Sequence, residues 1–326
     1  MSSYLSLQGV LAGVPNVSKF GSQHIQRHEK VNAYFQLQST YWKEIYTSSG
    51  LYGEIYRNRH DAVLDWVDSL DLPSGTRVLE IGCGAGLMSI ALARRGFHVY
   101  SIDSVETMVE QARKLAFESE FAGILTVDVG DVYSLTSEDE SFDLVIAVGV
   151  IPWLERVDLA IQQMARVTRP EGQIIVTVDN WARLTNFLDP WLNPALGPLK
   201  RGMKDLLDRV GLRRRSFSDI GAIYHSRRFI DEAMARVKFI KDRSMTLGFG
   251  PFTLFRHTVI PESLGIRLNY WLQSLADRNV PLFRSTGAHY IVLARKSISG
   301  PPTLSKSAEK SVSDAIHVLS TVREVQ

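Results

Sequence analysis

The sequence predicts an α/β fold in which a mostly parallel sheet lies between layers of helices. Three observations lead to this fold class. A short apolar strand ends in a glycine-rich turn at residues 78–86, a second apolar strand ends in an acid at Asp103, and strand-like runs alternate with helical segments from about residue 75 to 180. Such alternation favours a doubly wound parallel sheet, whose ligands bind at the carboxyl ends of the strands.

The first strand and the turn after it carry most of the functional information. An apolar run that contains one acid leads directly into three glycines at alternate positions: Val78, Leu79, Glu80, Ile81, Gly82, Gly84, Gly86. Glycine has no Cβ and tolerates positive φ, so this turn lets the backbone pass close to a ligand. A helical stretch, residues 87–95, follows at once. The layout is typical of a nucleotide-like binding site.

The other elements of this core follow in order along the chain. They are a second strand at 97–103, a third at 125–130 followed by Asp131 and Val132, a fourth with its turn at 141–149, a helix at 157–168, a turn at 169–172 and a fifth strand at 173–178. Asp103 and Asp131 each end a strand. Because the carboxyl ends of parallel strands meet at one edge, these acids are expected near the glycine turn.

The glycine spacing separates two classes of binding site. A dinucleotide site carries G-x-G-x-x-G, whereas here the third glycine comes one residue early and Leu87 stands in its place. The run Glu80–Gly86 instead resembles the E/D-x-G-x-G-x-G motif of class I S-adenosylmethionine-dependent methyltransferases. The strand-acid pattern, Phe142-Asp143 and the Arg169-Pro170-Glu171-Gly172 turn resemble the same family, over about residues 75–180.

The resemblance implies a Rossmann-like fold and a set of cofactor contacts. In the family, the glycine loop faces the methionine and ribose part of S-adenosylmethionine, the acid at Asp103 binds the ribose hydroxyls, and the acid at Asp131 lies against the adenine amino group. An aromatic and a basic residue on the preceding helix approach the methionine end. The implied cofactor residues are Glu80, Gly82, Cys83, Gly84, Gly86, Asp103, Ser104, Asp131, Val132, Val148, Tyr56 and Arg59. Cys83 is expected to be a small filler, not a nucleophile.

Composition bounds the remaining possibilities. The 326 residues are 45% hydrophobic with a net charge of +2, which gives no argument for a nucleic-acid partner. The single cysteine excludes an intrachain disulfide and indicates a reducing, cytoplasmic location. No stretch approaches the ~20 apolar residues of a membrane span.

The segments outside the core suggest a division of the chain. We expect a mobile leader at 1–27, aromatic-rich cap helices at 28–70, the cofactor-binding core at 71–180, a helical lid at 181–243, strands and a helix completing the sheet at 244–296, and a disordered tail at 297–326. The resemblance implies a seven-stranded sheet with an antiparallel last strand, supplied by runs at 244–255 and 286–295. A helix at 261–279 lies between these two runs.

A basic amphipathic helix at about 192–212 belongs to the expected lid. Packing on the sheet with a solvated basic face is the favoured interpretation, and peripheral contact with a membrane surface is the alternative. The aromatic cap helices are compatible with a homodimer.

The acceptor side is less defined by motifs. Ile151-Pro152-Trp153 stands where methylases of amino groups carry N-P-P-Y, which weakens a nucleobase or protein target. Trp153, Tyr52 and Asn180 are the candidate substrate contacts. For proton removal, His225 is favoured because it lies in a polar cluster of the lid, with Asp179 and His289 as alternatives. No metal-ligand spacing is present.

The sequence therefore predicts an enzyme that transfers a methyl group from S-adenosylmethionine to a small, apolar molecule by O- or C-methylation. Lipid, isoprenoid, quinone and other secondary metabolites all remain open as acceptors. A nucleic-acid methyltransferase that uses Arg213–Arg215 and Arg227–Arg228 is one alternative, and a non-catalytic protein that keeps the fold is another. A dehydrogenase is disfavoured by the glycine spacing.

Overall fold

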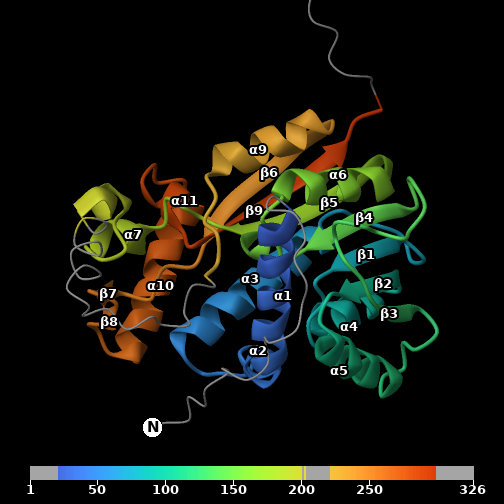
Figure 1. Cartoon of the computed structure of the whole chain (residues 1–326), viewed down its shortest axis with the longest axis horizontal. Coiled ribbons are helices and arrows are strands. Elements are labelled where there is room, and N and C mark those ends of the chain that lie inside the picture. The colour runs from blue at the N-terminus through green and yellow to red at the C-terminus, as the bar shows by residue number, and fades with distance from the viewer. Residues whose placement is uncertain (1–20, 200–201, 203–220, 299–326) are drawn as a thin grey trace, which may run out of the picture.

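The computed structural model describes residues 21–199, 202 and 221–298 (Figure 1). Most of the predicted leader, the greater part of the predicted basic helix at 192–212, Arg213–Arg215 and the tail from residue 299 lie outside the described residues. None of the helices in the described ranges has the length and apolar composition that a bilayer span requires.

A seven-stranded sheet organises the described chain, in the order β3-β2-β1-β4-β5-β9-β6. Its strands are β1 (Arg77–Ile81), β2 (His98–Asp103), β3 (Leu125–Val129), β4 (Phe142–Ala147), β5 (Thr168–Asp179), β6 (Phe239–Leu247) and β9 (His289–Lys296). The first five are parallel, and β9 is antiparallel to both β5 and β6. The predicted seven-stranded, mostly parallel sheet with an antiparallel last strand is confirmed.

The strand order reverses direction between β1 and β4. From β1 the chain moves outward through β2 to β3, and it then crosses back to β4 and continues outward through β5 on the other side. The loops that leave β1 and β4 therefore diverge and open a crevice at their carboxyl ends. Open α/β sheets bind their ligands at such a switch point.

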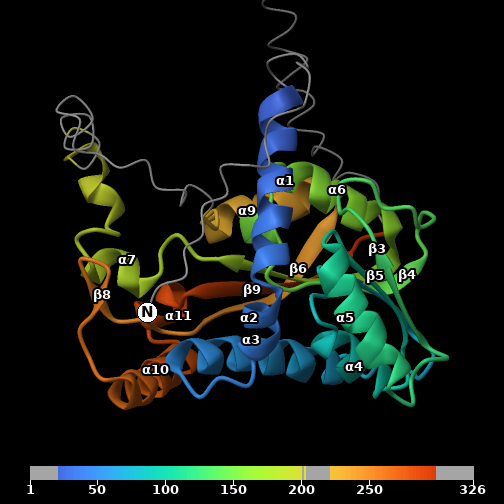
Figure 2. The same ribbon diagram turned by 60° about the horizontal axis from the view of Figure 1, so that its bottom comes forward.

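Helices cover both faces of the sheet (Figure 2). α6 (Val157–Val167) and α9 (Arg227–Arg236) lie on one face, and α3 (Leu51–Asp68), α4 (Leu87–Ala93), α5 (Glu106–Phe117) and α10 (Glu262–Asp277) lie on the other. Strand residues alternate between the two cores: Val145 and Ala147 pack with α6, whereas Leu144 and Ile146 pack with α3 and α4. This period of two, buried on both sides, explains the continuous apolar runs of the strands.

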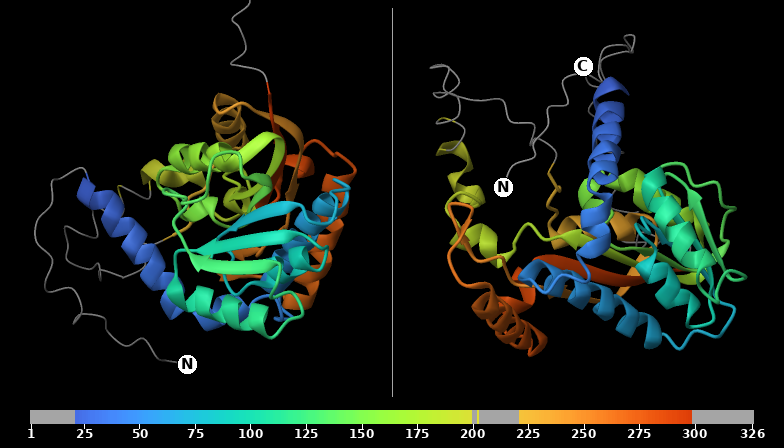
Figure 3. Two further views of the ribbon diagram at one scale, coloured as in Figure 1. Left: turned by 90° about the vertical axis from the view of Figure 1, so that its right-hand side faces the viewer. Right: turned by 90° about the horizontal axis from the view of Figure 1, so that it is seen from below.

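Two further helices precede α3. α1 (Gly21–Leu37) and α2 (Ser39–Glu44) follow one another, and α1 stands across the end of the sheet (Figure 3). Its contacts reach the loops after two strands: Ser104 Oγ donates to Asn32 Oδ1 at 3.0 Å, and Arg27 lies 3.8 Å from Glu155. Within the described residues the helix begins at Gly21, so residues 21–27 of the predicted leader lie in α1.

The remaining short elements lie around the carboxyl end of β5. They are η1 (Ile151–Trp153), α7 (Leu184–Leu188), η2 (Pro194–Leu196), the hairpin strands β7 (Thr253–Leu254) and β8 (His257–Thr258), and α11 (Phe283–Thr286). Phe249, Leu272 and Ala276 form a small separate core under them.

The structure corrects three predicted element boundaries. The strand predicted at 244–255 is β6, which starts at Phe239 and ends at Leu247, where Gly248 takes a φ of +78° and turns the chain. Phe239 at its start is buried, but residues 240–244 are exposed and mostly polar because β6 is an edge strand, so no apolar pattern marks this part of the strand. β6 also places residues 239–243, predicted to belong to the lid, in the sheet.

The third correction concerns the turn predicted at 169–172, which interrupts β5 without ending it. Thr168 pairs with Phe142 and Gln173 with Leu144, so four residues bulge out between two paired positions, and Glu171 takes a φ of +61°. The turn residues 169–172 mark the bulge in the sequence, but they do not reveal that Thr168 before it already pairs with β4.

Candidate active site

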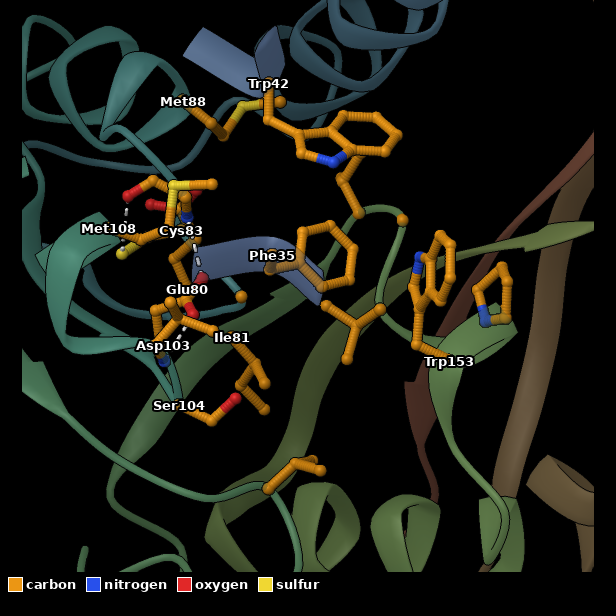
Figure 4. A pocket seen from close by; sticks show the side chains of 18 of the residues that line it. Phe35, Trp42, Glu80, Ile81, Cys83, Met88, Asp103, Ser104, Met108 and Trp153 are labelled. Atoms are coloured by element: carbon orange, nitrogen blue, oxygen red, sulfur yellow. Dashed lines mark hydrogen bonds between the residues drawn. The ribbon is translucent and has the colours of Figure 1, made fainter. Parts of the chain in front are cut away.

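A pocket opens at the switch point between β1 and β4 (Figure 4). The loop after β1, the acid that ends β2, the turn after β3 and residues 148–150 after β4 form one side. Side chains of α1, α2, α3 and η1 contribute much of the remainder, together with Met88 of α4, Met108 of α5 and Asp179 of β5. Phe35, Trp42 and Trp153 lie across the pocket from Cys83 and Asp103.

The glycines after β1 take the left-handed conformations that the motif predicts. Gly82, Gly84 and Gly86 have φ values of +71°, +53° and +86°. A Cβ on Gly82 would lie 2.3 Å from Val150 Cγ2, so this glycine lets the loops after β1 and β4 approach one another. A Cβ on Gly84 would meet no protein atom within 4 Å, although Gly84 lines the pocket. Gly84 therefore leaves space for a ligand.

Asp103 holds the glycine loop as well as facing the pocket. Its Oδ2 accepts from the backbone N–H of Gly84 at 2.9 Å, and its Oδ1 accepts from that of Val105 at 2.9 Å. Burial raises the pKa of Asp103, and the backbone donors partly offset that effect. Ser104, also predicted at the site, lines the pocket and pins α1 through Asn32.

Glu80 supports the loop from behind. Its side chain is buried and accepts from Ser89 Oγ at 2.5 Å and from Ser101 Oγ at 3.0 Å. Burial raises the pKa of Glu80 to about 7. Ser89 belongs to α4, so this acid joins the strand before the loop to the helix after it.

Cys83 occupies the interior of the loop. Its thiol is buried and lies 3.7 Å from the carbonyl oxygen of Gly84. Burial raises its pKa well above the ordinary value, and the carboxylates of Glu80 and Asp103 add to that effect. A thiol held in this form is a poor nucleophile, as expected of a filler residue.

Asp131 and Val132 follow β3 at the far end of the pocket. Asp131 Oδ1 accepts from the backbone N–H of Tyr133 at 2.9 Å, and Oδ2 lies 3.8 Å from His28 Nε2 of α1. Val132 and Val148 both line the pocket as predicted.

A chain of touching rings forms the opposite wall. Trp153 packs edge-on against Phe35 with centroids 4.8 Å apart, Phe35 contacts Trp42 at 5.4 Å, and Trp42 contacts Tyr56 at 5.7 Å. Sequence reasoning noted the aromatic richness of residues 28–70 but assigned only Tyr56 and Tyr52 to the site. It missed Phe35, Trp42 and Tyr46, together with His28 and Asn32 of α1. No motif marks them, because their approach depends on where α1 packs.

Arg59 brings a buried positive charge to the pocket. Its residue is 5% exposed, and its guanidinium lies 4.6 Å from the centre of the Tyr56 ring. Its Nε has no hydrogen-bond partner among the described residues. A buried arginine without a hydrogen-bonded acceptor is costly, so an anionic ligand group in the pocket would satisfy it.

Asp179 ends β5 at the same end of the pocket and lines it. His289 of β9 lies beside it, with Nδ1 3.1 Å from Asp179 Oδ1. Burial opposes ionisation of Asp179, but the His289 hydrogen bond and the charges of Arg59 and Arg183 outweigh it, so the pKa of Asp179 is lowered. Burial lowers the pKa of His289.

Four residues predicted at the site do not line this pocket: Gly86, Asn180, His225 and Tyr52. Gly86 instead lets α4 begin close to α5, since an added Cβ would lie 3.0 Å from Ala112 Cβ. Asn180 is fully buried, and its side-chain amide nitrogen donates to the carbonyl oxygens of Ser285 and Gly287 while its oxygen accepts from the backbone of Ala182. It fixes the chain after β5 and has no group left for a substrate.

His225 and Tyr52 lie elsewhere. His225 pairs through its backbone with Asp179 and Trp181, its ring stacks on Phe229 at 5.2 Å, and it is not among the residues that line the pocket. Of the two residues predicted for proton removal, Asp179 lines the pocket and His225 does not. Tyr52 is half exposed at the start of α3.

The pocket fits S-adenosylmethionine on the observations above. Gly84 provides an open cradle, Asp103 and Asp131 offer carboxylates at successive strand ends, and Arg59 offers a cation. No group of three or more metal-ligating side chains occurs in the described ranges.

Fold and site together define the class: a Rossmann-like sheet with an acid, a glycine loop and a second acid at the switch point is the architecture of class I methyltransferases. Residues 79–176 match the family model described as a methyltransferase domain. The predicted resemblance to class I S-adenosylmethionine-dependent methyltransferases is confirmed, and this segment is a methyltransferase domain.

Two similar proteins are also methyltransferases by name. The chain is 32% identical over 106 residues to a ubiquinone biosynthesis O-methyltransferase of Chelativorans sp., covering 32% of this chain and 41% of that protein. It is 30% identical over 168 residues to a 2-methyl-6-phytyl-1,4-hydroquinone methyltransferase of Synechocystis, covering 46% of this chain and 51% of that protein. The chain thus spans about half or less of these relatives' lengths.

A solved structure shows the same fold over a longer stretch. The magnesium protoporphyrin IX methyltransferase of Synechocystis, determined with bound SAH, superposes with a TM-score of 0.55 at 20% identity. The superposition covers 83% of this chain and all of that one. At this identity the likeness concerns the fold, including elements beyond the matched domain.

Proposed function

We propose that this protein is a methyltransferase that uses S-adenosylmethionine to methylate a small, apolar acceptor. The observation that carries the proposal is the meeting, in one pocket, of the open Gly84 position, the carboxylate of Asp103 and the buried cation of Arg59. These features suit a ligand with a ribose at one place and a carboxylate at another. Without a ligand, a buried arginine that lacks a hydrogen-bonded acceptor is costly.

The cofactor would lie along the carboxyl ends of the strands. Asp103 would accept hydrogen bonds from the ribose hydroxyls, Asp131 would lie at the adenine end with Val132, and Arg59 would pair with the methionine carboxylate. Glu80 would act indirectly, by holding the loop through Ser89 and Ser101. When bound, the cofactor supplies an electrophilic methyl group on a sulfonium. The residues of the pocket align the acceptor and exclude water.

The acceptor would occupy the aromatic side of the pocket. Phe35, Trp42, Tyr56 and Trp153 present ring faces and edges that suit an apolar or aromatic molecule. Two of the similar proteins, a ubiquinone biosynthesis O-methyltransferase and a hydroquinone methyltransferase, support an acceptor of quinol type. We include in the proposal that α1 and the segment after β5 form a lid, and that the enzyme acts in the cytoplasm. A homodimer and contact with a membrane surface stay predictions.

Calorimetric titration tests the proposal directly. The protein is titrated with S-adenosylmethionine, S-adenosylhomocysteine and NADH, with the Gly84→Ala variant as the matched control. We expect the two sulfur compounds to bind wild-type protein and NADH not to bind. Binding of NADH alone would favour a dehydrogenase, and failure of all three ligands to bind would favour a non-catalytic role for the fold.

A further inference from the structure

A histidine and an aspartate from neighbouring antiparallel strands meet at the edge of the pocket, beside Tyr56 of the aromatic wall. Asp179 is the last residue of β5, and His289, the first residue of β9, is its register partner. The His289 residue is 7% exposed, and its Nδ1 lies 3.1 Å from Asp179 Oδ1. Each backbone is fixed by the sheet, so the pair is held rigidly.

The two oxygens of Asp179 are not equivalent. His289 holds Oδ1, whereas Oδ2 has no hydrogen-bond partner among the described residues, and the side chain borders the pocket. Tyr56 lies next to the pair, with its ring centre 5.8 Å from that of His289, and it also belongs to the aromatic wall. Asp179 therefore presents one unsatisfied acceptor beside the rings that would hold an apolar substrate.

The surrounding charges keep this carboxyl group ionised. Arg59 and Arg183 both act on Asp179 and on His289 electrostatically, and His289 donates to it. The same cations oppose protonation of His289, whose ring is buried. The pair thus consists of a carboxylate and a neutral imidazole, and the imidazole proton on Nδ1 orients the carboxylate.

We propose that Asp179 Oδ2 binds the hydroxyl group of the acceptor and takes its proton during methyl transfer, and that His289 is the positioning residue for Asp179. This inference rests on the proposed methyltransferase function and narrows it to O-methylation. The aromatic wall would place a phenol-like ring so that its hydroxyl points toward Asp179.

The step balances without any further reactant. The acceptor oxygen forms a bond to the methyl carbon, the bond between that carbon and sulfur breaks, and the electron pair of that bond stays on sulfur. The acceptor's O–H bond breaks, its proton passes to Asp179 Oδ2, and Asp179 later releases this proton to solvent. The positive charge of the sulfonium and the negative charge of the carboxylate are both lost in this step.

The strength of the base favours a hydroxyl over a carbon acid. A carboxylate is a weak base for a carbon acid that must lose its proton before methylation, because general-base catalysis falls with base strength. A hydroxyl proton becomes strongly acidic as its oxygen gains the methyl group, and a weak base then suffices.

A binding experiment with 4-nitrophenol tests the inference, because its phenolate absorbs visible light and its neutral form does not. The phenol is titrated into the protein saturated with S-adenosylhomocysteine, and the pKa of the bound phenol is read from absorbance against pH. A nearby carboxylate disfavours the phenolate, so Asp179→Asn should lower the pKa of bound 4-nitrophenol by about one unit or more. The surface variant Asp158→Asn is the control and should leave that pKa unchanged.

His289 is tested by two substitutions that differ in one donor. His289→Phe keeps a ring against Tyr56 but removes Nδ1–H, so the pKa of bound 4-nitrophenol should move away from the wild-type value. His289→Asn restores a donor close to the position of Nδ1 and should return the pKa toward wild type. A merely structural histidine would give the reverse order, with the aromatic replacement better tolerated.

The outcomes separate this inference from the proposed function. Binding of S-adenosylhomocysteine without binding of 4-nitrophenol, or equal pKa values of the bound phenol in wild type and Asp179→Asn, would overturn the inference alone. Absence of S-adenosylhomocysteine binding to the wild type would instead overturn the proposed function. Normal binding of that compound to each variant shows that the variant is folded.

Discussion

The backbone N–H of Gly84 donates to Asp103 Oδ2 across 2.9 Å, which ties the loop after β1 to the acid that ends β2. The same carboxylate accepts from Val105 through its other oxygen. Asp103 thus has two roles: it fixes the shape of the glycine loop, and it lines the pocket where the loop opens. Both roles require an acceptor at this position.

Replacement of Asp103 by alanine should weaken cofactor binding strongly. Hydrogen bonds to a buried charge contribute about 1.5–3 kcal/mol each, so Asp103→Ala should raise the Kd for S-adenosylhomocysteine by at least roughly tenfold. Calorimetry on the folded variant measures this change. Asp103→Asn, which keeps an acceptor for Gly84, should lose less affinity. Unchanged affinity in Asp103→Ala would remove the ribose assignment.

Two glycines of the loop should respond differently to alanine. At Gly84 the added Cβ meets no protein atom within 4 Å, so Gly84→Ala should cost only about 1–2 kcal/mol of backbone strain while blocking the cofactor. At Gly82 the Cβ would lie 2.3 Å from Val150 Cγ2, so Gly82→Ala should destabilise the fold further. Urea unfolding and calorimetry on both variants separate the two effects. Equal loss of stability would contradict the open cradle.

The loop and the acids that follow the strands could be predicted because their positions depend on local chemistry. A glycine with positive φ, a strand that ends in an acid and the right-handed connection between parallel strands all follow from short segments of sequence. Asp103 and Asp131 therefore lie where the pattern places them, at the edge that the glycine loop shares. Arg59 also lines the pocket because the helix that carries it packs directly before β1.

Long-range packing decided the rest of the site. Asn180 looked like a substrate contact, but its amide is consumed by backbone carbonyls more than a hundred residues away. His225 stood in a polar cluster, but its backbone joins the end of β5 and its ring turns to Phe229. Phe35 reaches the pocket only because α1 crosses the sheet end. Composition within a segment carries no signal for such contacts.

Arg59 should distinguish ligands that carry the amino-acid part of the cofactor from those that lack it. 5′-Methylthioadenosine has no carboxylate, so wild type should bind S-adenosylhomocysteine more tightly than this compound. Arg59→Met should remove most of that preference, because a charge-assisted pair is lost, and should leave the affinity for 5′-methylthioadenosine nearly unchanged. Arg57→Met on the same helix is the control, since Arg57 pairs with Glu54. An undiminished preference in Arg59→Met would assign the carboxylate to another residue.

Glu80 should make stability fall as pH rises through the neutral range. Its pKa in the folded protein is about 7, against 4.5 for a glutamate carboxyl group in water, because burial disfavours its charge. A group whose pKa is raised on folding stabilises the protein fully below its unfolded pKa, and this contribution is lost as pH rises through its folded pKa. The loss of stability therefore falls between about pH 4.5 and 7 and amounts to about 3 kcal/mol.

Glu80→Gln tests this prediction, because it keeps a polar side chain for Ser89 and Ser101 but cannot ionise. Relative to wild type without cofactor, this variant should gain stability between pH 5 and pH 8, as measured by urea unfolding at both values. Glu232→Gln, at an exposed position, should show no such gain. A constant difference between Glu80→Gln and wild type across this range would mean that Glu80 is ionised at little cost, held by its two serine hydroxyls.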